Sequence, residues 1–206
     1  MNSPIGVILA GGLSRRMDGP EKSLIQLGDI PLIGHVASNL GSQTEPIIIN
    51  ANGDPGRFSS LSLPVQPDVV DGFVGPLAGV LSGMRWAKEN TDATHIITAA
   101  ADTPFFPRDY VSRMMKNAET SYAQIVLASS EGRRHPVFGF WPVDLADPLE
   151  HFLVDEENRK VMLFVERYAN NTEEFQSGSP DPFFNVNTPD DLAAAQTYYE
   201  SGMGNL

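Results

Sequence analysis

The chain has 206 residues, no cysteine and a formal net charge of −12, from 14 basic and 26 acidic residues. This charge argues against nonspecific binding to nucleic acid or to anionic membranes, because both kinds of partner select a basic surface. The lack of cysteine excludes disulfides, thiolate zinc sites, iron–sulfur clusters and a cysteine nucleophile.

Short apolar runs alternate with amphipathic stretches along the chain. In chain order, the apolar runs predict strands at Ile5–Leu9, Pro46–Asn50, His95–Ala99, Gln124–Ala128 and Pro136–Trp141. Helical spacing predicts helices at Pro31–Leu40, Pro76–Lys88, Pro107–Ala118, Asp144–Val154 and Arg159–Tyr168. A last helix is expected to begin with Thr188 as its N-cap and Asp191 at the capping-box position. The alternation predicts one α/β domain over residues 1–206, with a mostly parallel central sheet flanked by helices.

Two segments are expected to be long loops. The Pro- and Gly-rich segment Gln66–Gly79 is predicted to be an active-site loop, and the polar segment Asn170–Asp181 is predicted to be the other loop. Ligands of a parallel sheet bind beyond the carboxyl ends of its strands. The residues that follow each predicted strand are therefore the candidates for a functional site.

The segment after the first strand has the composition of an anion site. It begins Leu9-Ala10-Gly11-Gly12, and Arg15, Arg16 and Lys22 follow within one loop. Glycines at a strand end let backbone amides approach an anion closely, and the basic side chains have the charge to hold a triphosphate. The segment is neither a P-loop nor a dinucleotide fingerprint, because it lacks Gly-Lys-Ser/Thr and the third glycine. A plain turn with solvated side chains is the alternative, but three basic residues in one strand-end loop favour a phosphate site.

A single carboxylate, Asp102, follows the third of the buried strands. A lone carboxylate beside a phosphate loop suits Mg²⁺, which needs only one or two protein oxygens and takes its other ligands from phosphates and water. The alternative is an aspartate that caps a helix before Pro104. The position at the predicted ligand edge favours the metal role.

Other polar residues follow later strands. Asn50 and Asn52 come after the second strand, and Asp68 ends the next extended segment. Such side chains can read a base or a ribose by hydrogen bonds, although each alone is more typical of a turn. Asn185 lies one turn too early to cap the last helix, which leaves a site role open, whereas Asn187 also suits the start of that helix.

Arg133, Arg134 and His135 form a second basic cluster. It can receive an anionic second substrate, or it can be a plain exposed hairpin. The sequence favours neither reading over the other.

Together these motifs resemble the nucleotidyltransferases with a Rossmann-like α/β fold, and within them the molybdenum cofactor guanylyltransferase family. The segment Leu9–Lys22 is typical of the whole superfamily. The narrower family is indicated by Asn50-Ala51-Asn52, Gly75–Gly79, Asp102-Thr103-Pro104, His135-Pro136, Arg159–Met162 and Asn185–Pro189. The resemblance spans Ile5 to Leu192 and implies a three-layer fold with a mostly parallel central sheet.

The family joins GMP from Mg-GTP to the terminal phosphate of molybdopterin and releases pyrophosphate. The resemblance therefore implies Mg²⁺ as cofactor, GTP and molybdopterin or its molybdenum form as substrates, and transient contact with molybdoenzymes or other cofactor-assembly proteins. It implies GTP-binding roles for Leu9, Ala10, Gly11, Gly12, Lys22, Asn50, Asp68 and Asp102. It implies catalytic roles for Lys22, Asp102 and Arg15, with Mg²⁺ on Asp102 and the leaving phosphates on Arg15. It places molybdopterin near Arg133, His135, Arg159, Asn185 and Asn187, with the two asparagines beside either the metal or the pterin, so that the N-terminal part binds GTP and the C-terminal part binds the pterin.

The chain departs from the family pattern at three positions. Asp18 replaces the usual glycine and adds a negative charge beside the triphosphate site, Glu21 replaces an aspartate, and Ala101 replaces a cysteine. Two other functions remain open. One is a sister enzyme that uses CTP on molybdopterin, or another nucleotide on a sugar or alcohol phosphate. The other is a non-catalytic protein that binds GTP or the cofactor.

The expected location is the cytoplasm, and no nucleic-acid or membrane partner is expected. The apolar run Ile5–Ala10 is too short for the core of a signal peptide or for a membrane span. Arg15 and Arg16 are followed by polar residues rather than by the apolar run of a twin-arginine signal.

Overall fold

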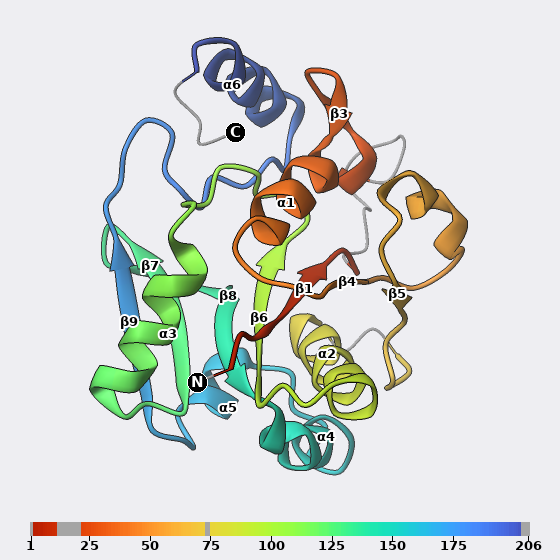
Figure 1. Cartoon of the computed structure of the whole chain (residues 1–206), viewed down its shortest axis with the longest axis vertical. Helices are drawn as coiled ribbons and strands as arrows, with labels where there is room; N and C mark the ends of the chain where they lie inside the picture. Colours follow the sequence, from red (N-terminus) through yellow and green to blue (C-terminus); the bar gives the residue numbers. More distant parts are fainter. Residues whose placement is uncertain (1, 12–21, 73–74, 203–206) are drawn as a thin grey trace.

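The computed structural model describes residues 2–11, 22–72 and 75–202, and its centre is a sheet with the strand order β5-β4-β1-β6-β8-β7-β9 (Figure 1). In chain order the strands of this sheet are β1 (Ile5–Leu9), β4 (Ile47–Asn50), β5 (Val65–Gln66), β6 (His95–Ala100), β7 (Ile125–Ser130), β8 (Arg133–Pro142) and β9 (Asn170–Phe175). Among the described strands of the sheet, β8 alone runs antiparallel to its neighbours. The predicted α/β fold with a mostly parallel sheet is therefore confirmed.

The helices lie between and after the strands. They are α1 (Leu32–Gly41), α2 (Pro76–Asn90), α3 (Tyr110–Ser121), α4 (Ala146–Val154), α5 (Val161–Val165) and α6 (Pro189–Glu200). Short 3₁₀ turns occur at η1 (Lys22–Leu24), η2 (Pro55–Leu61) and η3 (Val143–Leu145). A small hairpin, β2 (Gln26–Leu27) with β3 (Ile30–Pro31), precedes α1. None of the helices in these ranges is long and apolar enough to cross a membrane.

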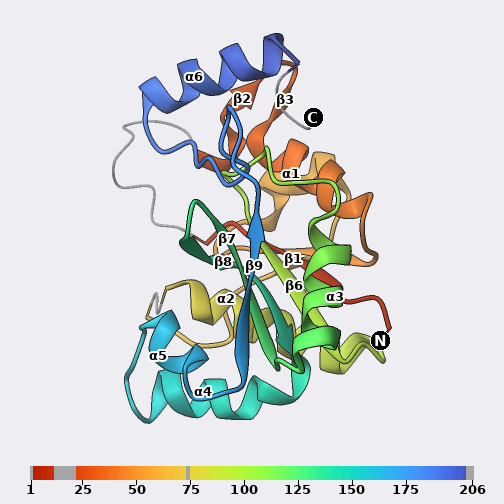
Figure 2. The same cartoon turned by 90° about the vertical axis from the view of Figure 1, so that its left-hand side faces the viewer.

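The sheet is buried on both faces, which makes the architecture three-layered (Figures 1 and 2). Successive residues of a strand point to opposite faces, and β1 shows the consequence. Ile8 packs in one core with Leu40 of α1 and Met114 of α3, whereas Val7 packs in the other core with Leu81 of α2. Residues of α4 and α5 belong to this second core. The near-continuous apolar runs of the central strands follow from this double burial.

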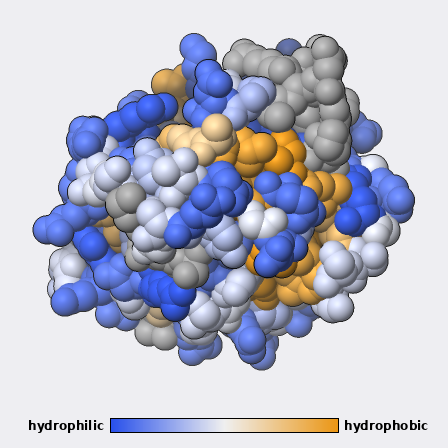
Figure 3. Space-filling model, turned by 90° about the horizontal axis from the view of Figure 1, so that it is seen from above, coloured by the Kyte–Doolittle hydropathy of each residue, from blue (hydrophilic) through white to orange (hydrophobic). Residues whose placement is uncertain are grey.

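The helix α6 lies away from both faces of the sheet, beyond its carboxyl-terminal edge, at the top of Figure 1. It packs on the β2–β3 hairpin, and Thr188 with Asp191 forms the predicted capping box at its start. Seen from this end, the molecular surface is mostly hydrophilic and carries one hydrophobic area near its middle (Figure 3).

The prediction of a loop over Asn170–Asp181 was wrong in its first half, because Asn170–Phe175 forms β9. The strand pairs with β7 at the edge of the sheet, from Ile125 opposite Asn170 to Ser130 opposite Phe175. An edge strand with polar residues on its exposed side has no apolar run, and of its six residues only Phe175 is fully buried. That composition is the reason why the sequence pattern did not reveal it.

The helix predicted over Arg159–Tyr168 is much shorter, because α5 contains only Val161–Val165. Its start is set by Asn158, whose side-chain oxygen accepts a hydrogen bond from the Lys160 backbone amide at 3.1 Å. Arg159 therefore lies in an exposed turn before the helix. The strand predicted from Pro136 also begins earlier, at Arg133, so that the second basic cluster is part of β8.

A buried hydroxyl joins β6 to β8 below the functional edge. Thr98 is fully buried, and its hydroxyl donates to the carbonyl of Val137 at 2.7 Å. The same oxygen accepts hydrogen bonds from the Gly139 amide and from the Trp141 indole, both at 3.1 Å.

We expect Thr98→Val to keep the packing volume but to leave two buried donors, the Gly139 amide and the Trp141 indole, without an acceptor. An unsatisfied buried donor costs about 1–3 kcal/mol, so the free energy of unfolding should fall by about 2–4 kcal/mol. Urea denaturation measures this change. Thr120→Val on the exposed side of α3 is the matched control and should stay within about 0.5 kcal/mol of the parent protein. Equal stabilities of the two variants would contradict the role assigned to Thr98.

Candidate active site

The carboxyl ends of three neighbouring parallel strands, β4, β1 and β6, meet at one edge of the sheet. Backbone hydrogen bonds continue past the strand ends and hold them together. The Ala10 amide donates to the carbonyl of Asn50 at 2.9 Å, and the Ala101 amide donates to the carbonyl of Leu9 at 3.1 Å. The start of the predicted phosphate segment thus lies between Asn50 and the residue that precedes Asp102.

A cationic centre lies at this edge, where the Lys22 ammonium contacts three side-chain oxygens. It donates to Asn185 Oδ1 at 3.1 Å, and it also contacts the Asp102 carboxylate and Asn187 Oδ1. The side chains of Lys22 and Asp102 are 18% and 21% exposed, so the pair is largely shielded but open to a ligand. The structure therefore brings together four of the residues that the sequence singled out.

Asp102 is not a helix cap, which excludes the alternative reading of this residue. The first helix after it, α3, has Asp109 as its N-cap. Asp102 instead lies in a turn, where its backbone carbonyl accepts a hydrogen bond from the Val186 amide at 2.9 Å. This bond fastens the segment with the two asparagines to the end of β6.

The start of α6 leaves the Asn187 side chain available for the cationic centre. Thr188 is the N-cap, and the Asp191 carboxylate accepts hydrogen bonds from the backbone amides of Asn187 and Thr188, at 3.0 and 2.8 Å. Hydrogen bonding to Thr188 is the main cause that lowers the pKa of Asp191. Asn187 is consequently held by its backbone while its amide oxygen points to Lys22. No pattern in the sequence had indicated Asp191 as a residue that supports the site.

A smaller cavity of about 320 Å³ lies on one side of the cationic centre. Its walls are Leu9, Gly11, Asn50, Asp68, Gly75, Pro76, Gly79, Ala100, Asp102, Val137 and Asn185. The Asp68 carboxylate is fixed in this wall, because it accepts hydrogen bonds from Asn50 Nδ2 at 3.0 Å and from Asn52 Nδ2 at 2.8 Å. The Asp68 amide donates back to Asn52 Oδ1 at 2.9 Å. The pair of asparagines thus orients one carboxylate, which leaves it able to accept further hydrogen bonds from a ligand.

Gly79 makes room for this arrangement. A Cβ atom at Gly79 would lie 2.3 Å from Asn50 Oδ1 and 2.6 Å from a methyl carbon of Leu9. Asn50 cannot turn away freely, since its Nδ2 also donates to the Gln66 carbonyl at 3.2 Å and to Asp68.

We expect Gly79→Ala to displace Asn50 and with it the Asp68 carboxylate. The KM for GTP, the substrate that the family resemblance assigns to Asn50 and Asp68, should rise by about tenfold or more, because a buried hydrogen bond to a charged group is worth about 1.5–3 kcal/mol. Steady-state kinetics test this, with Gly34→Ala in α1 as the control, where the nearest atoms to the new Cβ are at 3.5 Å. An unchanged KM in Gly79→Ala would show that the cavity does not bind the nucleotide.

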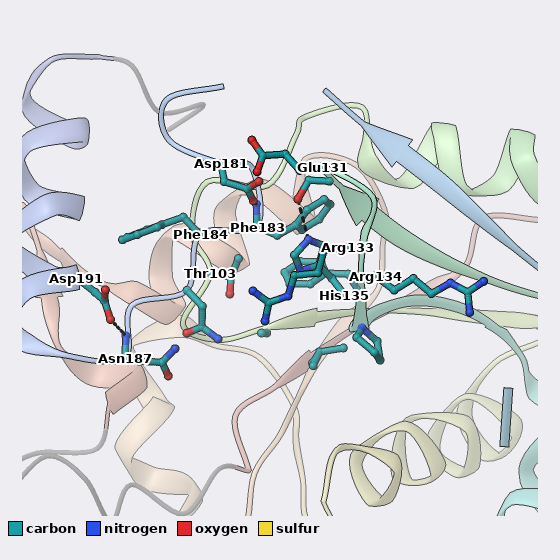
Figure 4. Close-up of a pocket in the computed structure, with 16 residues that line it drawn as sticks. Thr103, Glu131, Arg133, Arg134, His135, Asp181, Phe183, Phe184, Asn187 and Asp191 are labelled. Atoms are coloured by element: carbon teal, nitrogen blue, oxygen red, sulfur yellow. Dashed lines mark hydrogen bonds between the residues drawn. The ribbon is translucent and has the colours of Figure 1, made fainter. Parts of the chain in front are cut away.

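A larger cavity of about 610 Å³ is lined by Asn185 and Asn187 of the cationic centre (Figure 4). Its walls are Ala100, Thr103, Ser130, Glu131, Arg133, Arg134, His135, Pro136, Val137, Phe138, Asp181, Phe183, Phe184, Asn185, Asn187 and Asp191. Ala100, Val137 and Asn185 also line the smaller cavity. The two cavities therefore share a wall at the end of β6.

The basic cluster is both a hairpin and a cavity wall, so its two sequence readings are compatible. Arg133 and Arg134 extend to opposite sides of β8 in Figure 4, as successive residues of a strand do. His135 accepts or donates one hydrogen bond with the Ser130 hydroxyl at 2.8 Å, and its ring lies 4.5 Å from the Phe183 ring. Partial burial of His135 is the main cause that lowers its pKa. The imidazole is thus predominantly neutral at pH 7.

The hairpin is anchored to β9 by Glu174. Its carboxylate accepts a hydrogen bond from the Gly132 amide at 3.1 Å and another from the Ser129 hydroxyl. The Ser129 hydrogen bond is the main cause that lowers the pKa of Glu174. Sequence reasoning missed this residue because it lies in the strand that was predicted to be a loop.

One of the residues carried over from the family stands apart from this arrangement. Arg159 is exposed and lines neither the smaller nor the larger cavity. Gly12 and Arg15 lie outside the described residues. Sequence reasoning also missed the aromatic wall of the larger cavity, formed by Phe138, Phe183 and Phe184, whose apolar character is typical of core residues.

Comparison with known proteins is consistent with this geometry. Residues 6–171 match the family model described as the MobA-like NTP transferase domain. A protein of Mesorhizobium japonicum, named molybdenum cofactor guanylyltransferase, is 50% identical over 95% of this chain and 96% of its own length. A protein of the same name from Bradyrhizobium is 46% identical over 93% and 91%.

The fold also matches a solved structure, molybdopterin-guanine dinucleotide biosynthesis protein A from Archaeoglobus fulgidus. The TM-score is 0.73, and the match covers 96% of this chain and 99% of the other at 22% identity. At that identity the match shows the fold alone. The sequence matches go further, and they show that the chain belongs to the molybdenum cofactor guanylyltransferase family of MobA-like nucleotidyltransferases.

Proposed function

We propose that the protein transfers GMP from GTP to the terminal phosphate of molybdopterin, which releases pyrophosphate and forms the guanine dinucleotide. The observation that carries this proposal is the pair of cavities that share a wall beside one cationic centre. Transfer between two anions needs two binding sites that meet where positive charge is concentrated. The named relatives favour this function over the use of CTP and over non-catalytic binding of GTP.

The smaller cavity is the proposed site of GTP. Asp68 offers an oriented acceptor for the hydroxyl or N–H donors of a nucleoside, and Gly11 leaves the backbone open for approach by phosphates. Lys22 supplies positive charge at the boundary of the cavity. Gly12 and Arg15 keep the roles that the family resemblance implies, as further contacts of the triphosphate.

Mg²⁺ is the proposed metal, and the residues at the cationic centre fit it. Oxygen atoms of Asp102, Asn185 and Asn187 converge on the Lys22 ammonium, which shows that they can surround one cation. Carboxylate and amide oxygens suit this hard ion, and Asp102 with one asparagine would be enough to hold it. When bound, Mg²⁺ supplies positive charge that offsets the charge of the triphosphate.

The larger cavity is the proposed site of molybdopterin. Arg133 and the neutral His135 can hold a phosphate, and Phe183 and Phe184 offer flat apolar surfaces for a ring system. A phosphate at neutral pH is already ionised and needs no general base to attack. The work of the site is therefore to align the two substrates and to neutralise charge. Arg159 retains only the role implied by the resemblance, outside this cavity.

A transfer assay tests the proposal. The purified protein is given each of the four Mg-nucleotides together with molybdopterin generated in place, and pyrophosphate and product mass are measured. We expect a pterin–guanine dinucleotide with GTP and no product with the other nucleotides. A cytosine product would retain the mechanism and overturn the donor. Tight GTP binding without pyrophosphate release would favour the non-catalytic alternative.

A further inference from the structure

Two chain segments build the cationic centre, and each leads into an element that takes part in a second contact. Lys22 begins η1, which is the element before the β2–β3 hairpin, and Asn185 and Asn187 lie in the segment that leads into α6. The hairpin and α6 pack on each other. The same two parts of the chain therefore meet at two places, first at the cationic centre and again where α6 packs on the hairpin.

The remote contact is made by the last turns of α6 against the turn of the hairpin. Gly28 has a φ of +63°, and a Cβ atom there would lie 2.3 Å from the Tyr199 ring. The Gly28 amide donates to Gln196 Oε1 at 3.2 Å. Only glycine thus allows the turn to approach Tyr199 this closely.

His35 of α1 contacts both the hairpin and α6 at the same place. Its ring shares a 2.7 Å hydrogen bond with the Leu27 carbonyl in the hairpin, and its edge faces the Tyr199 ring at a centroid distance of 5.4 Å. Gly28, His35 and Tyr199 therefore form one packed unit, which we call the clasp. Gly28 and His35 thus both lie against the Tyr199 ring.

A buried cluster connects the clasp to the cationic centre. Leu27 of the hairpin, Ala195 of α6 and Val186 belong to the same apolar cluster, and all three are fully buried. Val186 lies between the two asparagines, and its amide is bonded to the Asp102 carbonyl. A displacement of α6 on the hairpin would therefore move Asn185 and Asn187 relative to Lys22.

We propose that the clasp is a positioning device, in which Tyr199 acts through α6 to set the two asparagine oxygens against Lys22 and Asp102. Tyr199 lines neither cavity and contacts neither substrate in this scheme. Its effect should therefore appear in cation affinity rather than in the nucleoside contacts of Asn50 and Asp68. The inference rests on the proposed function in one respect, which is that the bound cation is Mg²⁺.

The test compares Tyr199→Ala, which removes the ring, with Tyr199→Phe, which keeps it. Mn²⁺ binding in the presence of GTP is measured by electron paramagnetic resonance, and GTP binding without metal is measured by calorimetry. We expect Tyr199→Ala to weaken Mn²⁺ binding by about 10- to 100-fold, as supporting residues of metal sites commonly do. GTP binding without metal should change by less than about twofold, and Tyr199→Phe should restore most of the Mn²⁺ affinity.

Thr197→Ala is the matched control, because Thr197 is exposed on the same turn of α6. A second variant, Gly28→Ala, pushes on the ring from the hairpin side and should weaken Mn²⁺ binding in the same way. Since both changes break one contact, the double variant should be no worse than the more impaired single variant. A Tyr199→Ala protein with a lower melting temperature but unchanged Mn²⁺ affinity would overturn the proposal. Failure of the parent protein to bind Mn²⁺ with GTP would instead count against the proposed function.

Discussion

Replacing Asp102 with alanine should lower kcat for GMP transfer by about 10³-fold, which corresponds to about 4 kcal/mol of transition-state stabilisation. Asp102 supplies the one carboxylate among the oxygens that converge at the cationic centre. Its loss would remove the one charged ligand that we propose for Mg²⁺. The neutral asparagines cannot replace that charge.

The fold should survive this change. The Asp102 side chain is 21% exposed and is not part of the apolar core. The hydrogen bond from the Val186 amide goes to the Asp102 backbone carbonyl, which alanine retains. Circular dichroism and the melting temperature check this point, and Asp109→Ala at the start of α3 is the matched carboxylate control. Turnover by Asp102→Ala at the parent rate would remove Asp102 from the reaction.

Replacing Lys22 with alanine should lower kcat by about 10²- to 10³-fold. The Lys22 ammonium contacts three oxygen atoms, which belong to Asp102 of the smaller cavity, Asn187 of the larger cavity, and Asn185, which lines both. A compact ammonium there offsets the repulsion between the triphosphate and the attacking phosphate. Lys22→Arg should recover only part of the rate, because the larger guanidinium does not fit the place of a point charge.

Lys88→Ala on the exposed surface of α2 is the control for loss of one positive charge, since its side chain is 56% exposed. It should leave kcat within about twofold of the parent value, because exposed charges are screened by salt. Equal losses in Lys22→Ala and Lys88→Ala would mean that only the net charge of the protein matters.

The central strands and the ligand edge could be predicted because their signals are local. Ile5–Leu9 and His95–Ala100 are apolar on both faces, which makes them stand out as buried strands. Parallel strands end at one edge, so Asp102 and Asn50 could be assigned to the same site without any coordinates.

Features that depend on long-range docking could not be predicted in the same way. Lys22 and Asn187 are separated by 165 positions in the chain. The packing of α6 on the hairpin and the hydrogen bond from the Val186 amide to the Asp102 carbonyl help to bring them together. The resemblance placed Asn185 and Asn187 near the metal or the pterin. In the structure Asn185 lines both cavities, whereas Asn187 lines the larger cavity. Glu174 was missed because β9 is a polar edge strand, whose stability comes from pairing rather than from an apolar run.

The assignment of the two cavities is the central claim, and a crystal structure with Mg²⁺ and a non-hydrolysable GTP analogue tests it most directly. We predict that the guanosine lies in the smaller cavity, against Asp68, and that the α-phosphate lies beside Lys22 and Asp102. The larger cavity, with Arg133 and Phe183, should remain open for the second substrate. A nucleotide bound in the larger cavity, with the smaller one unoccupied, would contradict the account.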